Sequence, residues 1–228
     1  GSLKIIKGEK AGFQKDCLIK AVRISAPAAF EQGAISGAMV VSTRIVAPLG
    51  TVAIAANSLA VTAESFCYMP GYGLEASATT LVGQSIGAGH SRLAVSFAWI
   101  TTFMGMIMMS AMGVLMYFIC PAVFVFLTPD IAVRELGARV LRIELLAEPF
   151  FGASIVAAGA LRGAGDTLIP SIMNLVSIWG VRITLALLLV GRMGLTGMWT
   201  AMCVELCFRG IIFLIRLKRG KWMTKYTC

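Results

Sequence analysis

Residues 93–119 read LAVSFAWITTFMGMIMMSAMGVLMYFI, a run of 27 residues without a charged side chain. An α-helix needs about 20 apolar residues to cross the hydrocarbon core of a bilayer. A helix on the surface of a soluble domain keeps a charged or polar face for water, and this run has no charged face. The stretch therefore predicts a membrane-spanning helix.

Composition extends this interpretation to the whole chain of 228 residues. Apolar residues make up 58% and charged residues 14%, and the mean hydropathy is +0.85. A soluble domain carries about a quarter charged residues, so lipid is the expected solvent. The net charge of +9 comes mainly from basic residues near the two ends. That pattern follows the positive-inside rule and indicates no nucleic-acid partner.

The predicted fold class is all-α, a polytopic membrane protein whose six transmembrane helices form one bundle. The spans are expected near residues 21–46, 51–87, 92–119, 133–161, 168–190 and 195–217, with short Gly- and Pro-rich turns between them. Residues 1–20 predict an amphipathic linker on the cytoplasmic membrane surface, and residues 218–228 a basic cytoplasmic tail. Thirteen Lys and Arg lie on the side of both termini against four on the other, which favours cytoplasmic termini.

Motifs of water-soluble enzymes are absent from the sequence. It contains no Walker loop, no dinucleotide fingerprint and a single histidine, His90, in a polar turn. The six cysteines form no CxxC pair, and we interpret them as small packing residues. We therefore expect neither an enzyme nor a resident metal centre or organic cofactor.

Carboxylates at membrane depth are the candidate functional groups. They are Glu31, Glu64, Glu75, Glu144, Glu148 and Glu205. A charge at the bilayer centre costs at least ~2.5 kcal/mol on insertion scales, so such groups face the bundle interior or water. Glu31 is the strongest candidate because no basic residue lies within one helical turn of it. A plain buried hydrogen bond is the alternative for Glu31.

Pairing with arginine is the alternative for other acids. Arg209 follows Glu205 by four residues on the same helical face, and this pair is expected. Arg142 is a candidate partner of Glu144. Glu75 and Glu144 also lie toward the ends of their helices, where water can solvate them. The arginines whose partners the sequence leaves open are Arg142, Arg182 and Arg209.

Amides inside the apolar spans join the acids as candidates. The residues expected to bind substrate or coupling ion are Glu31, Gln32, Asn57, Glu64, Glu148 and Asn174. Each amide would either line a cavity or hydrogen-bond across helices, and the sequence leaves both alternatives open.

Prolines and glycines within the spans predict bending points and close contacts. A proline removes a helix hydrogen bond, and the candidate hinge residues are Pro27, Pro70, Gly71 and Gly73, with Pro149 as a further break. The GxxxG pairs, Gly33/Gly37, Gly83/Gly87 and Gly159/Gly163, predict close helix packing within the bundle.

Several short motifs resemble one transporter family over nearly the whole chain. They include Pro27-Ala-Ala-Phe-Glu31, Val82-Gly-Gln84, Leu161-Arg-Gly-Ala-Gly-Asp-Thr167 and Gly194-Leu-Thr-Gly197. In order and helix position they resemble the C-terminal six-helix lobe of the multidrug and toxic compound extrusion (MATE) transporters.

The resemblance implies a twelve-helix exporter whose two lobes enclose a cavity, with alternating access and inward H⁺ or Na⁺ driving efflux of organic cations. It implies that Glu31 matches an acid that recurs on the first helix of this lobe, and that Glu31 would bind Na⁺ if Na⁺ is the coupling ion. Glu144 or Glu148 would supply a further acid from the fourth helix.

The resemblance also implies partners and a location. The expected partners are membrane lipid, small organic cations and an N-terminal six-helix lobe that this chain lacks, so the chain alone is expected to be a partial transporter. The expected location is the plasma membrane, in bacteria the inner membrane.

Two other functions stay open at this point. A related flippase for lipid-linked oligosaccharides would share the architecture. It would be expected to carry more cationic residues in its cavity, whereas here the buried acids outnumber the buried bases. A non-transporting membrane assembly subunit would use its glycine faces for packing only.

Overall fold

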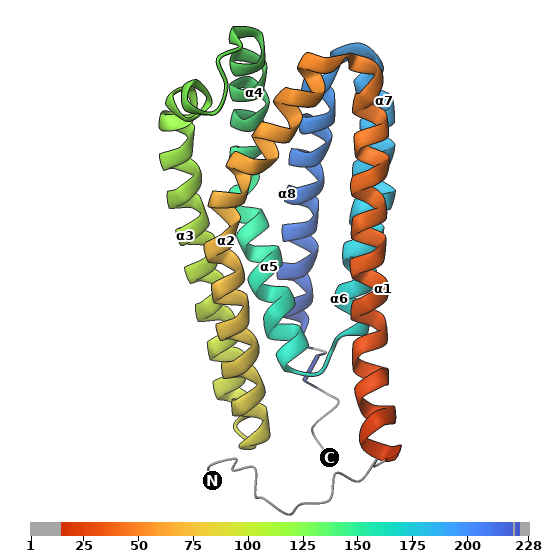
Figure 1. Ribbon diagram of the computed structural model, residues 1–228. Helices are drawn as coiled ribbons and strands as arrows, with labels where there is room; N and C mark the ends of the chain where they lie inside the picture. The colour runs from red at the N-terminus through yellow and green to blue at the C-terminus, as the bar shows by residue number, and fades with distance from the viewer. Residues whose placement is uncertain (1–14, 221, 224–228) are drawn as a thin grey trace, which may run out of the picture.

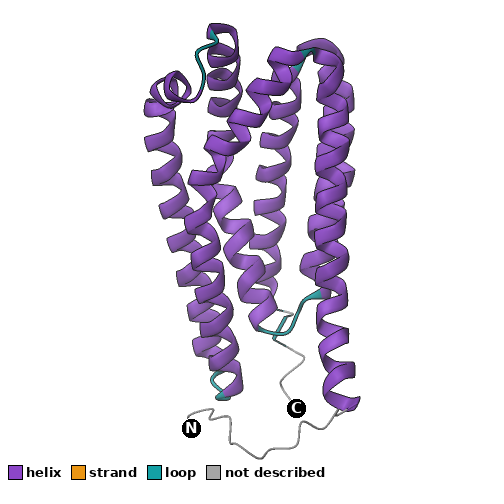
Figure 2. Ribbon diagram, viewed as in Figure 1, coloured by secondary structure: helices purple, strands orange, loops and turns teal. Residues whose placement is uncertain are grey.

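The computed structural model describes residues 15–220 and 222–223, and every regular element in this part of the chain is helical. Six helical rods run side by side there along one direction (Figure 1, Figure 2). They are α1 (Lys15–Val46), α2 (Thr51–Gly87), α3 (Ser91–Leu127), α4 (Ile131–Glu144) followed by α5 (Glu148–Gly163), α6 (Leu168–Leu175) followed by α7 (Thr184–Met193), and α8 (Leu195–Arg219). The predicted all-α bundle is confirmed.

Some helix ends differ from the predicted spans, whereas α2 has both predicted bounds. α1 already begins at Lys15, so the last residues of the predicted linker belong to this helix. α3 continues past the predicted end at 119, through Pro121 to Leu127, because apolar side chains continue there. Residues 1–14 of the predicted linker, and residues 221 and 224–228 of the predicted tail, lie outside the described residues.

Four described segments are long and apolar enough to cross a membrane. They are Thr51–Gly87, Ser91–Leu127, Leu168–Met193 and Leu195–Arg219. α4 differs from them because its 14 residues include five charged side chains. The rod of α4 and α5 nevertheless runs the length of the bundle beside α8 (Figure 1).

Two of the rods are interrupted in mid-bundle. A 3₁₀ turn at Leu145–Ala147 separates α4 from α5. The second residue of α5 is Pro149, which has no backbone N–H to donate. A π-helix at Val176–Ile183 links α6 to α7. Such π-helical turns are rare and frequently mark functional sites. This one reaches α1, because the indole Nε1 of Trp179 donates to the Ala34 carbonyl at 3.3 Å.

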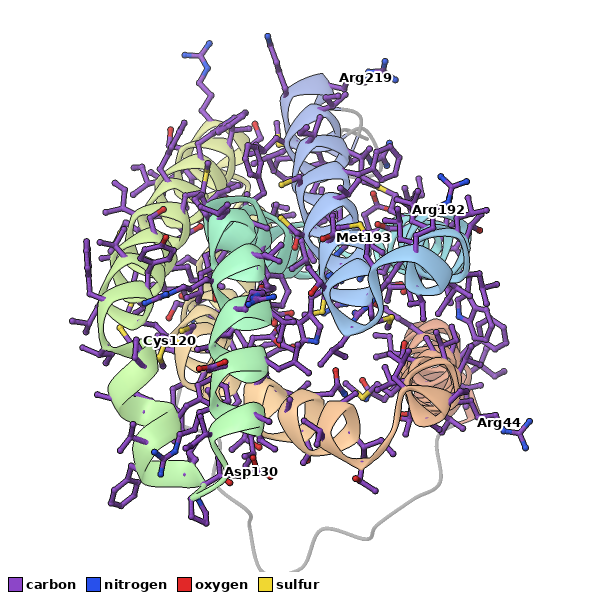
Figure 3. The ribbon with its side chains drawn as sticks, turned by 90° about the horizontal axis from the view of Figure 1, so that it is seen from above. Arg44, Cys120, Asp130, Arg192, Met193 and Arg219 are labelled. Atoms are coloured by element: carbon purple, nitrogen blue, oxygen red, sulfur yellow. The ribbon has the colours of Figure 1, made fainter. Side chains whose placement is uncertain are left out.

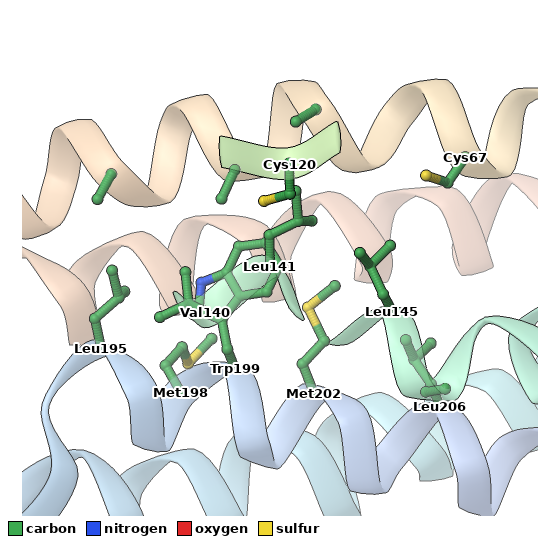
Figure 4. Packing of buried hydrophobic residues seen from close by; sticks show 14 of the residues in the cluster. Cys67, Cys120, Val140, Leu141, Leu145, Leu195, Met198, Trp199, Met202 and Leu206 are labelled. Carbon is green, nitrogen blue, oxygen red and sulfur yellow. The ribbon is translucent and has the colours of Figure 1, made fainter. Parts of the chain in front are cut away.

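A hydrophobic core fills the space between α2, α4 and α8. Figure 4 shows Leu141, Trp199 and Met202 packed together between α2 and α8. Cys67 and Cys120 are free thiols buried in the same core. This burial supports the interpretation of these two cysteines as packing residues.

The outer surface is apolar along α3, and Arg44 and Arg192 lie on the outside of the bundle. Ile107, Phe118 and Phe126 are 70%, 74% and 92% exposed, which suits contact with lipid tails. Arg44 and Arg192 project outward from different corners in the view from above (Figure 3). These two arginines therefore do not neutralise acids in the bundle interior.

α2 and α5 cross closely because glycines remove the side chains between them. A Cβ at Gly159 would lie 2.7 Å from the carbonyl oxygen of Glu75, and a Cβ at Gly163 would overlap the carbonyl oxygen of Thr79. The hydroxyl of Thr79 donates to the Gly159 carbonyl at 2.9 Å. The predicted close packing of the Gly159/Gly163 pair is confirmed, and it brings Arg162, which lies between them, beside α2.

Replacing Gly163 by alanine is expected to lower the free energy of unfolding by about 1–3 kcal/mol, the usual cost of overpacking a tight site. The added methyl group would force α2 and α5 apart. Thermal unfolding in detergent, followed by circular dichroism, measures this loss. Gly73→Ala on α2 is the matched control, because a Cβ there meets no atom within 4 Å. Equal stability of the two variants would contradict the close crossing.

Candidate functional site

The side chain of Glu31 lies where four helices meet, and Glu31 is 4% exposed. Its Oε1 accepts hydrogen bonds from Arg162 Nη2 at 3.0 Å and from Asn174 Nδ2 at 2.6 Å. Its Oε2 accepts from Ser171 Oγ at 2.6 Å. Arg162 Nη1 also donates to Glu75 Oε1 at 2.7 Å. We call these five side chains the Glu31 centre.

The connection between α5 and α6 places the two neutral donors of the centre. The chain turns at Gly165, whose φ of 74° is in the left-handed region that favours glycine. Asp166 follows and accepts from Arg216 Nη2 of α8 at 2.6 Å, which fixes the turn to the end of α8. Ser171 and Asn174 are three residues apart on α6 and therefore share the helix face that meets α1.

The charges of the Glu31 centre do not balance. Two carboxylates, Glu31 and Glu75, share one guanidinium, Arg162, so the centre carries a net charge of −1 when both carboxylates are ionised. Taking an uncompensated charge out of water costs several kcal/mol. One monovalent cation beside the carboxylates would remove the imbalance. The arrangement is therefore suited to binding H⁺, Na⁺ or one singly charged organic cation.

A second group of acids lies between α2, α4 and α5. Glu64 is 4% exposed and Glu144 and Glu148 are 0% exposed, and we call these three residues the buried-acid cluster. They interact electrostatically with one another, and Arg182 interacts with Glu64 and Glu144. Within the described part of the chain, the carboxylate oxygens of Glu144 and Glu148 have no hydrogen-bond partner. A buried carboxylate without a partner is stabilised by a bound proton.

The expected pair of Glu205 and Arg209 is confirmed on α8. Arg209 Nε lies 3.1 Å from Glu205 Oε1, and Glu205 is 0% exposed. The same Oε1 accepts from Ser177 Oγ of the π-helix at 2.6 Å. Arg182, also on the π-helix, directs its Nη2 to the sulfur of Met202 at 2.8 Å. The hydrogen bond from Ser177 to Glu205 thus links the π-helix to α8. Arg182 interacts electrostatically with Glu64 and Glu144, which lie on other helices.

The sequence-based alternatives for Glu144 were wrong. Arg142 does not pair with it: the Arg142 guanidinium lies over the ring of Tyr117, 5.1 Å from its centroid, and Arg142 Nε donates to the Tyr117 carbonyl at 3.4 Å. Solvation is also excluded, because Glu144 is fully buried. The physical reason is that residues two apart on a helix point to different sides of it.

The six candidate substrate or ion residues do not form a single site. Glu31 and Asn174 meet in the Glu31 centre, whereas Glu64 and Glu148 lie in the buried-acid cluster. Gln32 is exposed on α1 and belongs to neither group.

Asn57 has a structural partner of its own. Its Oδ1 accepts from Trp199 Nε1 at 3.0 Å, and Trp199 is 1% exposed. Of the two alternatives that the sequence left open for this amide, a hydrogen bond across helices is the one that the structure contains.

The candidate hinge residues lie inside helices. Pro70 is within α2, whose upper and lower halves run in different directions (Figure 1). A Cβ at Gly71 would lie 2.7 Å from Met109 Sδ, so a larger residue there would displace the Met109 side chain of α3. Gly73 has open space around it, and Pro27 lies within α1. Bending at Pro27, Pro70, Gly71 and Gly73 stays a prediction.

Sequence reasoning missed the role of Arg162, and with it that of Glu75 and Ser171. In the sequence Arg162 lies near the end of a span, and it is one of the thirteen basic residues assigned to the side of both termini. It is separated from Glu31 by 131 positions, so a search within one helical turn of Glu31 could not find it. The one available signal was its place in the motif at 161–167.

The part of the chain that holds both groups of acids is similar to known proteins. The MatE family model matches residues 27–188, a range that contains the Glu31 centre and the buried-acid cluster. The chain is 32% identical over 214 residues to the probable multidrug resistance protein NorM of Brucella suis biovar 1, covering 89% of this chain and 44% of that protein. It is 27% identical over 203 residues to the probable multidrug resistance protein NorM of Thermotoga maritima, covering 88% and 44%. The chain spans less than half the length of these relatives.

Solved structures share the fold. A MATE structure in the straight conformation has a TM-score of 0.85 at 16% identity, covering 94% of this chain and 49% of that chain. A MOP superfamily transporter from Pyrococcus furiosus has a TM-score of 0.83 at 19% identity, covering 91% and 47%. The six-helix bundle therefore corresponds in fold to about one half of each of these proteins.

Proposed function

Because the chain belongs to the MatE family of membrane transporters, we propose that it forms one lobe of an exporter that moves organic cations out of the cell in exchange for H⁺ or Na⁺. The names of its relatives, probable multidrug resistance proteins, support drug efflux. The observation that carries the proposal is the charge imbalance of the Glu31 centre, two carboxylates on one guanidinium.

The imbalance favours exchange over one-way movement. The Glu31 centre, in which Glu31 is buried, carries one uncompensated negative charge that one monovalent cation neutralises. Losing that cation restores the imbalance at a cost in free energy, so its release is favoured when another cation replaces it. A coupling ion and a drug cation that compete for Glu31 would therefore alternate at the site. Alternating access, with bending near Pro27 and Pro70, would expose the site first to one side of the membrane and then to the other.

The buried-acid cluster supports H⁺ as one coupling ion. A proton neutralises a carboxylate without needing further ligands, and neither Glu144 nor Glu148 has a hydrogen-bond partner among the described residues. Glu64 interacts electrostatically with both Glu144 and Glu148, so a proton bound by one acid changes the affinity of the others.

Interior charge favours cationic over anionic cargo. Apart from the pair of Asp166 and Arg216, the interior of the described spans holds six carboxylates and three guanidinium groups, those of Arg162, Arg182 and Arg209. A lipid-linked oligosaccharide flippase would be expected to show more cationic residues in its cavity.

The proposed setting is a plasma membrane, in bacteria the inner membrane, with a second six-helix lobe as partner. α1 begins and α8 ends at the same end of the bundle (Figure 1), and the last turn of α8 holds Arg216, Lys218 and Arg219. The positive-inside rule supports a cytoplasmic position for this end.

Transport by the complete protein tests the proposal. Inverted membrane vesicles that contain the full reading frame around this chain are given an outward H⁺ or Na⁺ gradient, and accumulation of ethidium is followed by fluorescence. We expect accumulation with at least one gradient and none in vesicles without the protein. Absence of gradient-driven accumulation of ethidium and of a panel of other organic cations would overturn the proposal.

A further inference from the structure

Arg162 is shared between two acids of different exposure. Its Nη2 contacts Glu31 and its Nη1 contacts Glu75, at 3.0 and 2.7 Å, so a different nitrogen serves each carboxylate. The exposed fraction of the side chains is 5% for Glu31, 17% for Glu75 and 32% for Arg162. The guanidinium is thus the most exposed of the three groups, and Glu31 is the more buried of its two acids.

Arg162 occupies the place on Glu31 that a bound cation would take. Both oxygens of Glu31 already accept hydrogen bonds, and the guanidinium is the one charged donor among the three that the structure places on them. Ser171 and Asn174 are neutral and can stay in place when another cation arrives. A cation that approaches Glu31 therefore has to compete with Arg162 and with no other positive charge of this centre.

Resting on the proposed function, we propose that Arg162 is a built-in competitor for the cation site on Glu31, and that Glu75 holds it when a cation takes its place. An arginine keeps its charge at all working pH values, so it can fill the site when neither ion nor drug is present. Glu75 gives the displaced guanidinium a carboxylate partner. With one monovalent cation on Glu31 and Arg162 on Glu75, the net charge of the centre is zero.

If Arg162 competes with the cation, replacing Arg162 and replacing Glu75 should change the cation affinity in opposite directions. In Arg162→Gln the competitor is absent and two carboxylates remain, so cation affinity rises. In Glu75→Gln the displaced arginine has no second partner and binds Glu31 more tightly, so cation affinity falls. In Glu31→Gln the site itself is lost. A centre in which Arg162 served only to hold helices together would give no increase in affinity for Arg162→Gln.

Equilibrium binding of a cation to this chain, purified in detergent, tests whether each variant raises or lowers the affinity as predicted. The probe is ethidium, measured by fluorescence anisotropy, with Na⁺ added as a competing cation. We expect the Kd of Arg162→Gln to be at least about tenfold lower than that of the unchanged chain, because a positive charge in direct contact with Glu31 is removed. We expect the Kd of Glu75→Gln to be several-fold higher and binding by Glu31→Gln to be lost.

Matched controls change the same charges on the surface. Arg92 and Glu135 are exposed, and Arg92→Gln and Glu135→Gln are expected to leave the Kd unchanged. Circular dichroism and gel filtration establish that each variant is folded.

The outcomes separate this inference from the proposed function. Loss of binding in Glu31→Gln without tighter binding in folded Arg162→Gln would overturn the role of Arg162 alone. Binding that does not depend on Glu31 would overturn the cation site and with it the proposed function. If Arg162→Gln does not fold, the Kd of Glu75→Gln for ethidium tests the inference instead. An unchanged or lower Kd in that variant would overturn the inference.

Discussion

A Glu31→Gln variant of the complete protein is expected to lose drug efflux and to fall to the level of cells that lack the transporter. The amide keeps the shape of the side chain and can still accept from Ser171, but it removes the charge that binds the cation. Truncating one partner of a buried charge pair costs about 2–5 kcal/mol, which lowers cation affinity by roughly 30-fold or more. The loss should appear as a drop in ethidium efflux rate and in drug resistance.

An exposed acid provides the control for this variant. Glu135 lies on the surface of α4, outside both groups of acids, and Glu135→Gln is expected to leave efflux unchanged. Membrane levels of both variants are compared by immunoblot, so that a loss of protein is not mistaken for a loss of transport. Wild-type efflux by correctly inserted Glu31→Gln would contradict the assigned role of Glu31.

An Arg209→Gln variant is expected to show the largest loss of stability. Glu205 is 0% exposed and its charged partner is Arg209, at 3.1 Å. Removing one partner of a buried ion pair destabilises by about 3–5 kcal/mol, and among the described basic residues Glu205 would keep only its electrostatic interaction with Arg182. Equilibrium unfolding of the chain in detergent, at several denaturant concentrations, measures the change in the free energy of unfolding.

The double variant Glu205→Gln/Arg209→Gln tests whether the lost charge pairing causes the loss of stability. It removes both charges, and the amide carbonyl that it introduces at position 205 can still accept from Ser177, so we expect it to recover much of the lost stability. Arg192→Gln, which changes a charge on the outer surface, is expected to alter stability by less than about 0.5 kcal/mol. A double variant as unstable as Arg209→Gln would indicate that packing, and not the unpaired charge, dominates.

The bundle could be predicted from the sequence because each helix is determined by its own residues. In a bilayer every backbone N–H and C=O group must be hydrogen-bonded within the protein. An α-helix does this within a single segment, so an uncharged run such as 93–119 predicts a helix. The bounds of α2 at 51–87 follow from glycines on both sides. The Glu205–Arg209 pair was predictable for the same reason, since a spacing of four residues places both side chains on one face.

The interruptions of the rods were only partly predictable. The 3₁₀ turn before Pro149 follows from the missing N–H of proline. The π-helix at Val176–Ile183 has no proline in it. Its contacts through Trp179 and Ser177 to α1 and α8 come from helices distant in sequence.

By itself the sequence determined that this chain is a helical membrane protein with acids in its spans, and that Glu31 has no basic neighbour on its own helix. Only the tertiary structure decided which charge faces Glu31. The packing of α5 against α2, through Gly159 and Gly163, sets Arg162 between Glu75 and Glu31. Electrostatic energy depends on distance in space and on burial, and neither is fixed until the helices pack.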